Sequence, residues 1–322
     1  MYPVIKIYRE RLKPPLANPG FLAKHRPAHY AATQDLIVPK EAVYRQIILN
    51  IPWQKTRRLV LVEFGFGPGT FLQTLIAALL KKHQPAHVIA FDLSPAMGDL
   101  AESRLEAAFP SKKSGGGASR SPDISVTLVT GVNCLGPKFS SSHLKAGHAD
   151  AIFQIQFFHY APNSPDSPLA RITSGEGMAK ITKKQWTRRV HRWLRPGGSL
   201  FDFNDFDSAC PLQNAISLAA WDLWVLRHMT NPKTQDKLEK THPSLANTIR
   251  RMYPVEAPLS ELLDAVRQRR EHRRTICREE VTTLRKHIEM LTDQFGKKQV
   301  KTLDTPLAFS HERFCLLLAQ KT

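Results

Sequence analysis

A short glycine-rich segment follows the first long apolar run of the chain, and it constrains the fold more than any other feature. Residues 59–64 read LVLVEF, which is typical of a strand buried on both faces of a parallel sheet. Gly65, Gly67 and Gly69 come next, and residues 70–83 then have helical periodicity with a basic last turn. A strand, a glycine turn and a helix in this order are the beginning of an α/β unit.

The alternation of strands and helices continues along the chain. Further strands are predicted at 86–92, 124–130, 149–157 and 199–206, with helices at 95–109 and 178–194. Ser94 and Pro95 are suited to begin the first of these helices. A helix at 279–294 and strands at 299–304 and 313–321 follow. We therefore expect a doubly wound, mostly parallel α/β sheet with helices on both faces.

The spacing of the glycines argues against two common phosphate sites. They stand at i, i+2 and i+4, whereas a dinucleotide fingerprint has its third glycine at i+5, and the GxxxxGK[ST] pattern is absent. Glu63 precedes the loop, where it would repel a phosphate and attract an ammonium group. Asp92 ends the second predicted strand, where a carboxylate can accept hydrogen bonds from ribose hydroxyls. The pattern predicts a ligand with a ribose and an amine, and S-adenosylmethionine meets this description.

Four segments resemble, in order, the motifs of the class I S-adenosylmethionine-dependent methyltransferases. They are VEFGFGPGT at 62–70, FDLSPAMGDLAESRL at 91–105, HADAIFQIQFFHY at 148–160 and RRVHRWLRPGGSLFDFNDF at 188–206. Agreement is weaker at 279–321. The resemblance implies a seven-stranded sheet with a reversed hairpin at its last two strands. It also implies that a methyl group is displaced from the sulfonium of the cofactor, so that much of the protein's task is alignment.

The resemblance assigns the glycine loop and two carboxylates to the cofactor. Gly65, Gly67 and Gly69 would let the backbone approach the methionine part and the adenosine. Glu63 would lie near the amino group of the methionine, and Asp92 would hold the ribose hydroxyls.

The resemblance also places three side chains near the adenine. Leu93 would pack on the ring, and Met97 would flank the same site. The family usually has an acidic residue after the third strand that binds the adenine amino group. Asn133 stands at that position here, and its side-chain carbonyl would accept the same hydrogen bond.

His159 and Tyr160 follow the fourth predicted strand, at the edge where open α/β sheets bind their ligands. Either side chain is a candidate general base, and a packing or capping role is the alternative for both. A base is needed only if the methyl acceptor carries a proton. No metal site is expected, because the 13 His are scattered and HExxH is absent.

The remaining sequence suggests four regions and a reducing compartment. Residues 1–58 are expected to form a basic lid segment and 59–207 the cofactor-binding α/β core. Residues 208–278 would be a helical insert on the acceptor side, and 279–322 would complete the core. The four Cys are far apart, no stretch reaches the length of a membrane span, and no secretory signal is recognisable, which favours the cytoplasm.

The net charge of +18 bears on the acceptor rather than on the cofactor. Residues 61–160, which contain three of the motifs, hold 8 Lys and Arg against 7 Asp and Glu. The first hypothesis is methyl transfer to oxygen or nitrogen of a small or medium-sized molecule, and the positive charge points to an acidic one. An RNA or ribosome-associated methyltransferase is an alternative, based on the basic residues 1–60 and 267–274. A non-catalytic S-adenosylmethionine-binding regulatory protein is another. The sequence indicates no oligomeric state.

Overall fold

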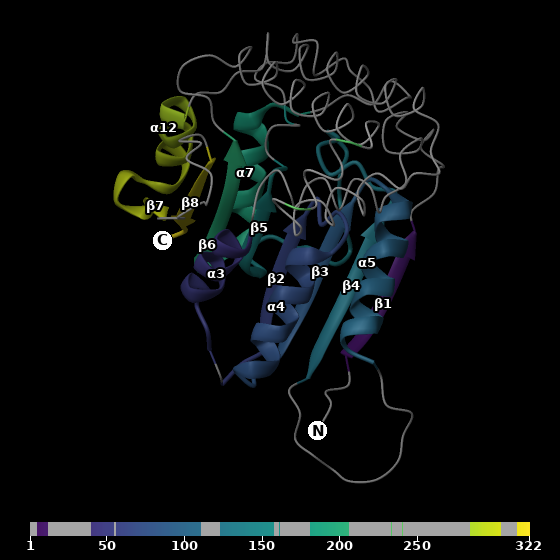
Figure 1. Cartoon of the computed structure of the whole chain (residues 1–322). Helices are drawn as coiled ribbons and strands as arrows, with labels where there is room; N and C mark the ends of the chain where they lie inside the picture. Colours follow the sequence, from purple (N-terminus) through teal and green to yellow (C-terminus); the bar gives the residue numbers. More distant parts are fainter. Residues whose placement is uncertain are drawn as a thin grey trace.

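The computed structural model describes residues 5–11, 40–54, 56–110, 123–157, 161, 181–205, 233, 240, 284–303 and 314–322. Within these residues, eight strands form one sheet in the order β1-β4-β3-β2-β5-β6-β8-β7 (Figure 1). Helices lie on both faces of this sheet, and most neighbouring strands are parallel. The predicted α/β fold is therefore confirmed.

Four parallel strands form the centre of the sheet. β2 (Leu59–Phe64) lies between β3 (Ala86–Asp92) and β5 (Ala149–Ile155), and β4 (Ile124–Thr130) lies beyond β3. Every residue of β4 and β5 is buried, and β2 and β3 each have a single half-buried position. Strands covered on both faces are mostly apolar, which explains why their limits agree with the predicted ones, except that β5 ends two residues early.

The last two strands form the reversed hairpin that the sequence implied. β6 (Leu194–Asp205) continues the parallel series beside β5, and β8 (Phe314–Gln320) then runs antiparallel to β6 and to β7 (Val300–Leu303). β6 begins five residues before the predicted strand at 199–206. Gly197 has a φ of 74°, and the pairing with β5 shifts register here, so Pro-Gly-Gly forms an irregularity within the strand rather than a turn before it.

The described residues form eight strands, one more than the seven that the resemblance implied. β1 (Ile5–Arg11) pairs in parallel with β4 and forms an edge of the sheet. Four of its seven residues, in the sequence IKIYRER, are charged, which suits an edge strand. Part of the predicted N-terminal lid segment is therefore sheet.

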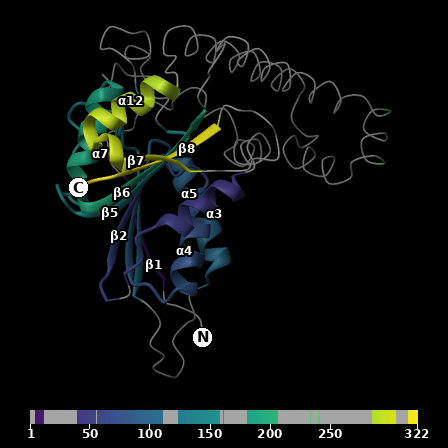
Figure 2. The ribbon, with the colours of Figure 1, turned by 90° about the vertical axis from the view of Figure 1, so that its left-hand side faces the viewer.

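The two faces of the sheet have separate hydrophobic cores, and helices cover each face (Figure 2). α3 (Glu41–Asn50), α4 (Thr70–Lys81) and α5 (Pro95–Ala108) cover one face, and α7 (Lys183–Trp193) and α12 (Leu284–Phe295) cover the other. Adjacent residues of β2 alternate between them, since Leu61 packs with the first set of helices and Val62 with the second. A short 3-10 helix, η2 (Lys297–Gln299), connects α12 to β7.

Two helices begin with caps that the sequence encodes. The Ser94 hydroxyl accepts a hydrogen bond from the Met97 amide at 3.4 Å, and Pro95 opens α5 as predicted. Thr182 and Gln185 form a reciprocal capping box at the start of α7. Such caps satisfy amides that would otherwise lack partners in the first turn.

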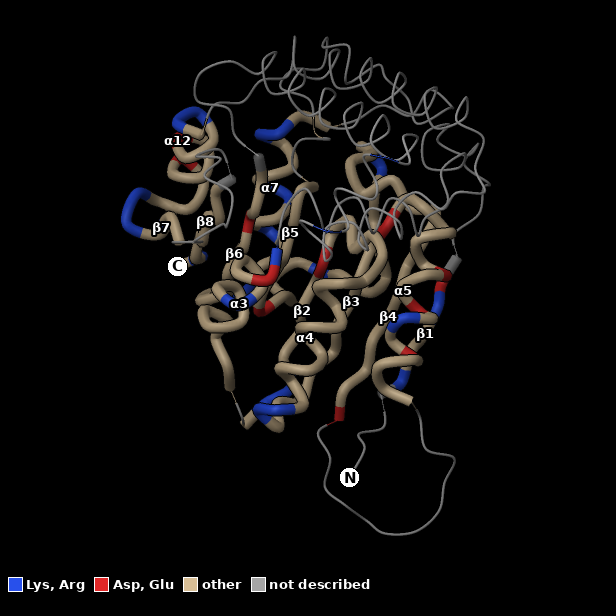
Figure 3. Tube along the Cα trace, in the orientation of Figure 1, with Lys and Arg blue, Asp and Glu red and all other residues tan. Residues whose placement is uncertain are grey.

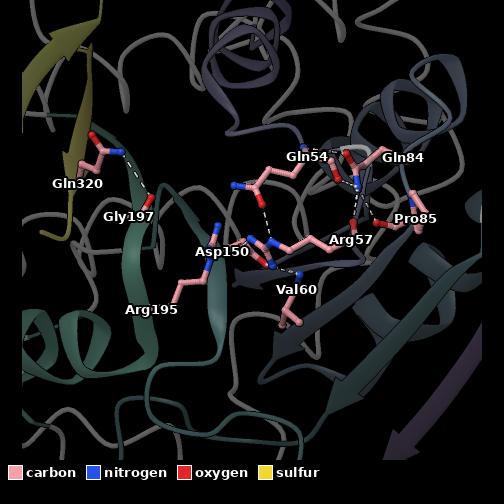
Figure 4. A network of polar contacts seen from close by, with 9 residues as sticks. All are labelled: Gln54, Arg57, Val60, Gln84, Pro85, Asp150, Arg195, Gly197 and Gln320. Carbon is pink, nitrogen blue, oxygen red and sulfur yellow. Dashed lines mark hydrogen bonds and ion pairs between the residues drawn. The ribbon is translucent and has the colours of Figure 1, made fainter.

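A polar network ties together the amino ends of the central strands (Figure 4). Asp150 is buried, and its carboxylate forms ion pairs with both Arg57 and Arg195. It also accepts a hydrogen bond from the Val60 amide at 2.8 Å. Beside it, the Gln84 side-chain amide donates to three backbone carbonyls at 2.9 to 3.0 Å. The amino edge of the sheet is thus occupied by structural contacts, which leaves the carboxyl edge for a ligand.

Several predictions concern residues outside the described ranges. The loop at 111–122 and the helical insert at 208–278, apart from two isolated residues, belong to this group. The proposed domain boundaries therefore remain predictions. Within the described part of the chain, no helix combines the length and the apolar character needed to cross a membrane.

Candidate functional site

The loop between β2 and α4 has a backbone that its glycines make possible. Gly65, Gly67 and Gly69 have φ values of 72°, 53° and 76°, in the left-handed region that residues with a Cβ rarely adopt. The Gly65 amide donates to the Phe91 carbonyl at 2.8 Å, so the loop starts against the end of β3. Gly69 is the N-cap of α4. The loop therefore turns sharply at the carboxyl edge of the sheet and leads directly into a helix N-terminus.

The three glycines differ in what surrounds them. A Cβ atom on Gly65 would lie 2.7 Å from Phe157 Cδ2, and one on Gly69 would lie 2.8 Å from Ala101 Cβ. A Cβ on Gly67 would meet no atom of the described residues within 4 Å. Gly65 and Gly69 thus allow close packing within the protein, whereas no described residue packs on the Cβ position of Gly67. Gly67 is the position where a ligand can approach the loop.

Asp92 connects this loop to β3. Its carboxylate accepts hydrogen bonds from the Gly67 amide at 2.9 Å and from the Ser94 amide at 2.8 Å, one on each oxygen. Each oxygen keeps a second lone pair for another donor. Burial raises the pKa of Asp92 from 3.8 to about 6, and these amides oppose the shift. Near neutral pH the group is therefore an ionised acceptor, beside the open position at Gly67.

Glu63 lies two residues before Gly65 and is buried, with 2% of its surface exposed. Its Oε2 atom has no hydrogen-bond partner among the described residues. Desolvation, and after it the charge of Asp92, raise the pKa of Glu63 from 4.5 to about 8, while Lys40 acts in the opposite direction. A buried carboxyl group with an unpaired oxygen is suited to bind a cation, and an ammonium group would favour its ionised form.

The residues expected near adenine follow β3 and β4. Leu93 is half-buried, whereas Met97, in the first turn of α5, is only 2% exposed. The Val132 amide lies 3.4 Å from the Asp92 carbonyl, which holds the segment after β4 against the end of β3. Asn133 follows, and its buried Nδ2 atom has no partner in the described part of the chain. An unpaired amide group here could bond the edge of a purine ring.

The candidate bases His159 and Tyr160 lie outside the described residues. Their assignment therefore remains a prediction. The preceding residues are described, and Gln156 has a φ of 55°, which is uncommon for a residue other than glycine. The strand β5 thus ends in a sharp turn at the same edge of the sheet as the glycine loop.

Two residues near the site were not singled out from the sequence. Phe157 contacts Gly65 closely and lies with its ring centre 6.0 Å from that of Phe64. Its place at the end of the predicted strand 149–157 was a signal that could have identified it. Lys40 acts electrostatically on Glu63 from the start of α3, and no feature of the sequence pointed to that contact.

No arrangement for a metal ion is found among the described residues. Groups of three or more His, Cys, Asp or Glu side chains that could hold one are absent there. The donors at the glycine loop are two carboxylates, an amide side chain and backbone groups. This set suits an organic ligand with hydroxyl and amino groups.

Methyltransferases recur among solved structures that resemble this chain. The CurJ carbon methyltransferase is 13% identical with a TM-score of 0.43, and the match covers 84% of this chain and 50% of that one. The citrinin polyketide synthase CMeT domain is 14% identical with a TM-score of 0.43, and the match covers 85% of this chain and 49% of that domain. An O-methyltransferase family protein from Burkholderia thailandensis is 11% identical with a TM-score of 0.42, and the match covers 88% of this chain and 56% of that one. This chain thus spans about half the length of these proteins.

No protein-family model matches the sequence, and a comparison with curated proteins finds no match. The similarity to the solved structures therefore concerns the fold.

Proposed function

We propose that this protein binds S-adenosylmethionine at the β2–α4 loop and transfers its methyl group. The observation that carries the proposal is the juxtaposition of Glu63, which has an unpaired buried oxygen, with the open backbone at Gly67 and the ionised Asp92. Glu63 can accommodate an ammonium group, Asp92 can accommodate a ribose, and Gly67 allows the ligand to approach the backbone closely.

Each described residue has a specific task in this proposal. Glu63 holds the ammonium of the methionine part, and Asp92 accepts hydrogen bonds from the ribose hydroxyls. Gly67 lets the backbone lie against the ligand. Leu93 packs on the adenine, and the Asn133 amide bonds its edge. When bound, the cofactor supplies a methyl group on a positively charged sulfur, which is already activated for transfer.

The protein's own contribution to the reaction is mainly alignment. The acceptor would enter at the carboxyl edge of the sheet, where β2, β3 and β5 end. We propose oxygen or nitrogen of a small or medium-sized molecule as the methylated atom, with His159 or Tyr160 as general base where the acceptor must lose a proton. The two described cysteines, Cys134 and Cys315, are free and buried, which fits the proposed cytoplasmic location.

Binding of two related ligands tests the cofactor assignment. S-adenosylmethionine and 5′-methylthioadenosine share the adenosine, but only the first has the ammonium group. Glu63→Gln should weaken binding of S-adenosylmethionine about tenfold and leave 5′-methylthioadenosine nearly unaffected, as expected for the loss of one charged hydrogen bond. Asp92→Ala should weaken both. If the wild-type protein binds neither ligand, the proposal is wrong.

Transfer of labelled methyl groups to a cell extract tests catalysis. Label in small molecules that persists after RNase treatment would support the proposed acceptor class. Label that is lost on RNase treatment would favour the RNA alternative. Binding of the cofactor without any label would instead favour the non-catalytic regulatory protein.

A further inference from the structure

The outward face of α7 is a stripe of positive charge. Lys184, Arg188 and Arg192 are all exposed and stand four residues apart, so they lie on one side of the helix. Four residues of an α-helix rise by about 6 Å, which spaces the three cations regularly along its axis. Residues 181–201 contain no Asp or Glu. Nothing within this segment neutralises the stripe.

The three cations have no evident role in holding the fold together. Within the described part of the chain, none of them forms an ion pair or a side-chain hydrogen bond. Like charges four residues apart destabilise a helix slightly. The stripe therefore works weakly against folding, which suggests that it serves to bind a partner.

The segment between β4 and β5 lies along one side of α7. The Arg189 guanidinium donates to the carbonyl oxygens of Gly136 and Pro137 at 2.9 and 3.0 Å. Further along, the Gly147 amide donates to the Arg192 carbonyl at 2.9 Å. These contacts fix the segment beside the helix at two points.

This segment adds two cations to the stripe. Lys138 and Lys145 are exposed, and residues 131–149 contain no Asp or Glu. We call the combined patch the α7 basic surface; it consists of Lys138, Lys145, Lys184, Arg188 and Arg192. Figure 3 shows α7 with repeated Lys and Arg positions along its length.

On the other side of α7, the exposed residues carry charges of both signs. There α12 packs against the helix, with the Phe295 ring 4.9 Å from that of His191. The exposed face of α12 has both signs: Arg285 and Lys286 are accompanied by Glu289 and Asp293. The outward face of α7 thus carries cations and no acid, whereas in the segment beside it His143 pairs with Glu10 of β1 at 2.6 Å.

We propose that the α7 basic surface binds the phosphate backbone of a single RNA strand. A strand presents one negative charge per nucleotide at regular intervals, as the stripe presents cations. Two of its three members are Arg, whose planar guanidinium suits phosphate oxygens. The contacts would be to the backbone, so binding would depend little on base sequence.

The packing of α7 argues against two other anionic partners. Its inner face, with Trp186, Val190 and Trp193, is buried in the core. The helix is also flanked by α12 and by the β4–β5 segment, so it cannot enter the major groove of a DNA duplex. It likewise has no apolar face to insert into a membrane.

The stripe leads toward the candidate site. The Ile181 amide donates to the Leu135 carbonyl at 2.8 Å, so α7 begins near the segment that follows β4 at the carboxyl edge. Lys184 lies in this first turn. An RNA strand on the stripe would extend toward the edge that holds Gly67 and Asp92.

Titration with a labelled 20-nucleotide oligouridylate tests the proposal in the whole 322-residue chain. The variant Lys184→Gln/Arg188→Gln/Arg192→Gln should bind about tenfold or more weakly at low salt. Because each neutralised phosphate of a single strand contributes about 0.7 to the slope of log K against log salt, the slope should become shallower by about 2.

A matched variant distinguishes RNA binding at this surface from a general effect of the net charge. Lys6→Gln/Arg45→Gln/Lys81→Gln also removes three exposed cations, from β1, α3 and α4. It should bind RNA as the wild-type protein does. Equal losses in the two variants would overturn the assignment to α7, provided that both keep the wild-type circular dichroism spectrum and thermal midpoint.

Competing anions test the choice of partner. The RNA assignment would be overturned if the wild-type protein fails to bind the oligouridylate at low salt. The same conclusion would follow if duplex DNA, polyglutamate or phosphatidylserine vesicles compete as well as unlabelled RNA of equal charge. The readout is binding, so it is independent of whether methyl transfer occurs.

Discussion

The Gly67 amide donates a hydrogen bond to Asp92 Oδ2 at 2.9 Å, and this bond joins the glycine loop to the end of the neighbouring strand. The other carboxylate oxygen of Asp92 accepts a hydrogen bond from the Ser94 amide at the start of α5. One carboxylate therefore positions two backbone segments and still has lone pairs for a ligand. Loss of this group should affect binding more than loss of any exposed acid.

Asp92→Ala should reduce the affinity for S-adenosylmethionine by tenfold to a hundredfold. The substitution removes the acceptor for the ribose and leaves the Gly67 amide without its partner, and hydrogen bonds to charged groups contribute roughly 1.5–3 kcal/mol. Isothermal titration calorimetry measures the change. Asp123→Ala is a suitable control, because this exposed side chain precedes β4 at the opposite edge of the sheet. Equal affinity of wild type and Asp92→Ala would refute the site.

Substitution of two loop glycines should separate stability from binding. Gly69→Ala places a Cβ 2.8 Å from Ala101 Cβ at a positive φ, so it should destabilise the protein by about 2 kcal/mol or more. The methyl group of Gly67→Ala meets no atom of the described residues, so the cost is mainly the backbone strain of about 1 kcal/mol. Its new methyl group would occupy the ligand's approach and weaken cofactor binding. Urea denaturation and calorimetry measure the two effects. A Gly67→Ala variant with unchanged affinity would contradict the proposed approach.

Stability of the unliganded protein should decrease as pH rises toward 8. The pKa of Glu63 is raised from 4.5 to about 8, so the folded protein binds more protons than the unfolded chain between these values. Its free energy of unfolding therefore falls with pH across this window and levels off above it. The raised pKa of Asp92 also makes the free energy of unfolding fall as pH rises, but only up to its pKa of about 6. Denaturation at pH 6.5 and 8.5 thus isolates Glu63, and Glu63→Gln should abolish most of the difference.

Binding of S-adenosylmethionine near pH 7 should release protons. Most Glu63 side chains are protonated there in the free protein, and the ligand's ammonium group favours the ionised form. Calorimetry in phosphate and Tris buffers, which differ in ionisation enthalpy, measures the number of protons released. The Glu63→Gln variant should show a smaller release. Identical proton counts for the two proteins would argue against an ammonium at Glu63.

The pair of His287 and Asp202 should be important for stability and not for the cofactor. His287 Nε2 lies 2.5 Å from Asp202 Oδ2, and both side chains are fully buried between α12 and β6. His287→Ala removes one partner of a buried polar pair, so it should lower the free energy of unfolding by about 3–5 kcal/mol. Urea denaturation checks this, with the exposed Glu289→Ala on the same helix as control. A loss below about 1 kcal/mol would show that the pair is dispensable.

The sequence was most informative where local patterns and long-range packing agree. β2, β3 and β4 have the predicted limits, because apolar runs bounded by Gly, Pro or charged residues are buried on both faces. β1 was missed, since three of its seven residues are Arg or Lys and a fourth is Glu10. Half-polar edge strands have only a weak hydrophobic signal.

Contacts between distant residues could not be predicted in the same way. The ion pairs of Asp150 and the pairing of Asp202 with His287 join segments far apart in sequence. Single charged residues in a strand give no indication of their partners. At the candidate site, the glycines and Asp92 were identified because their spacing reflects the loop itself, whereas the influence of Lys40 on Glu63 depends on tertiary packing.

The position of β8 has a consequence for how the protein is made. Among the described strands β8 is the last to leave the ribosome, yet it lies between β6 and β7 in the sheet. Until it is synthesised, β6 has an open edge and β7 has no partner among the described strands. The nascent chain therefore has an unprotected strand edge while the residues between β6 and β8 are being synthesised, which is the stage at which chaperones would matter most for this protein.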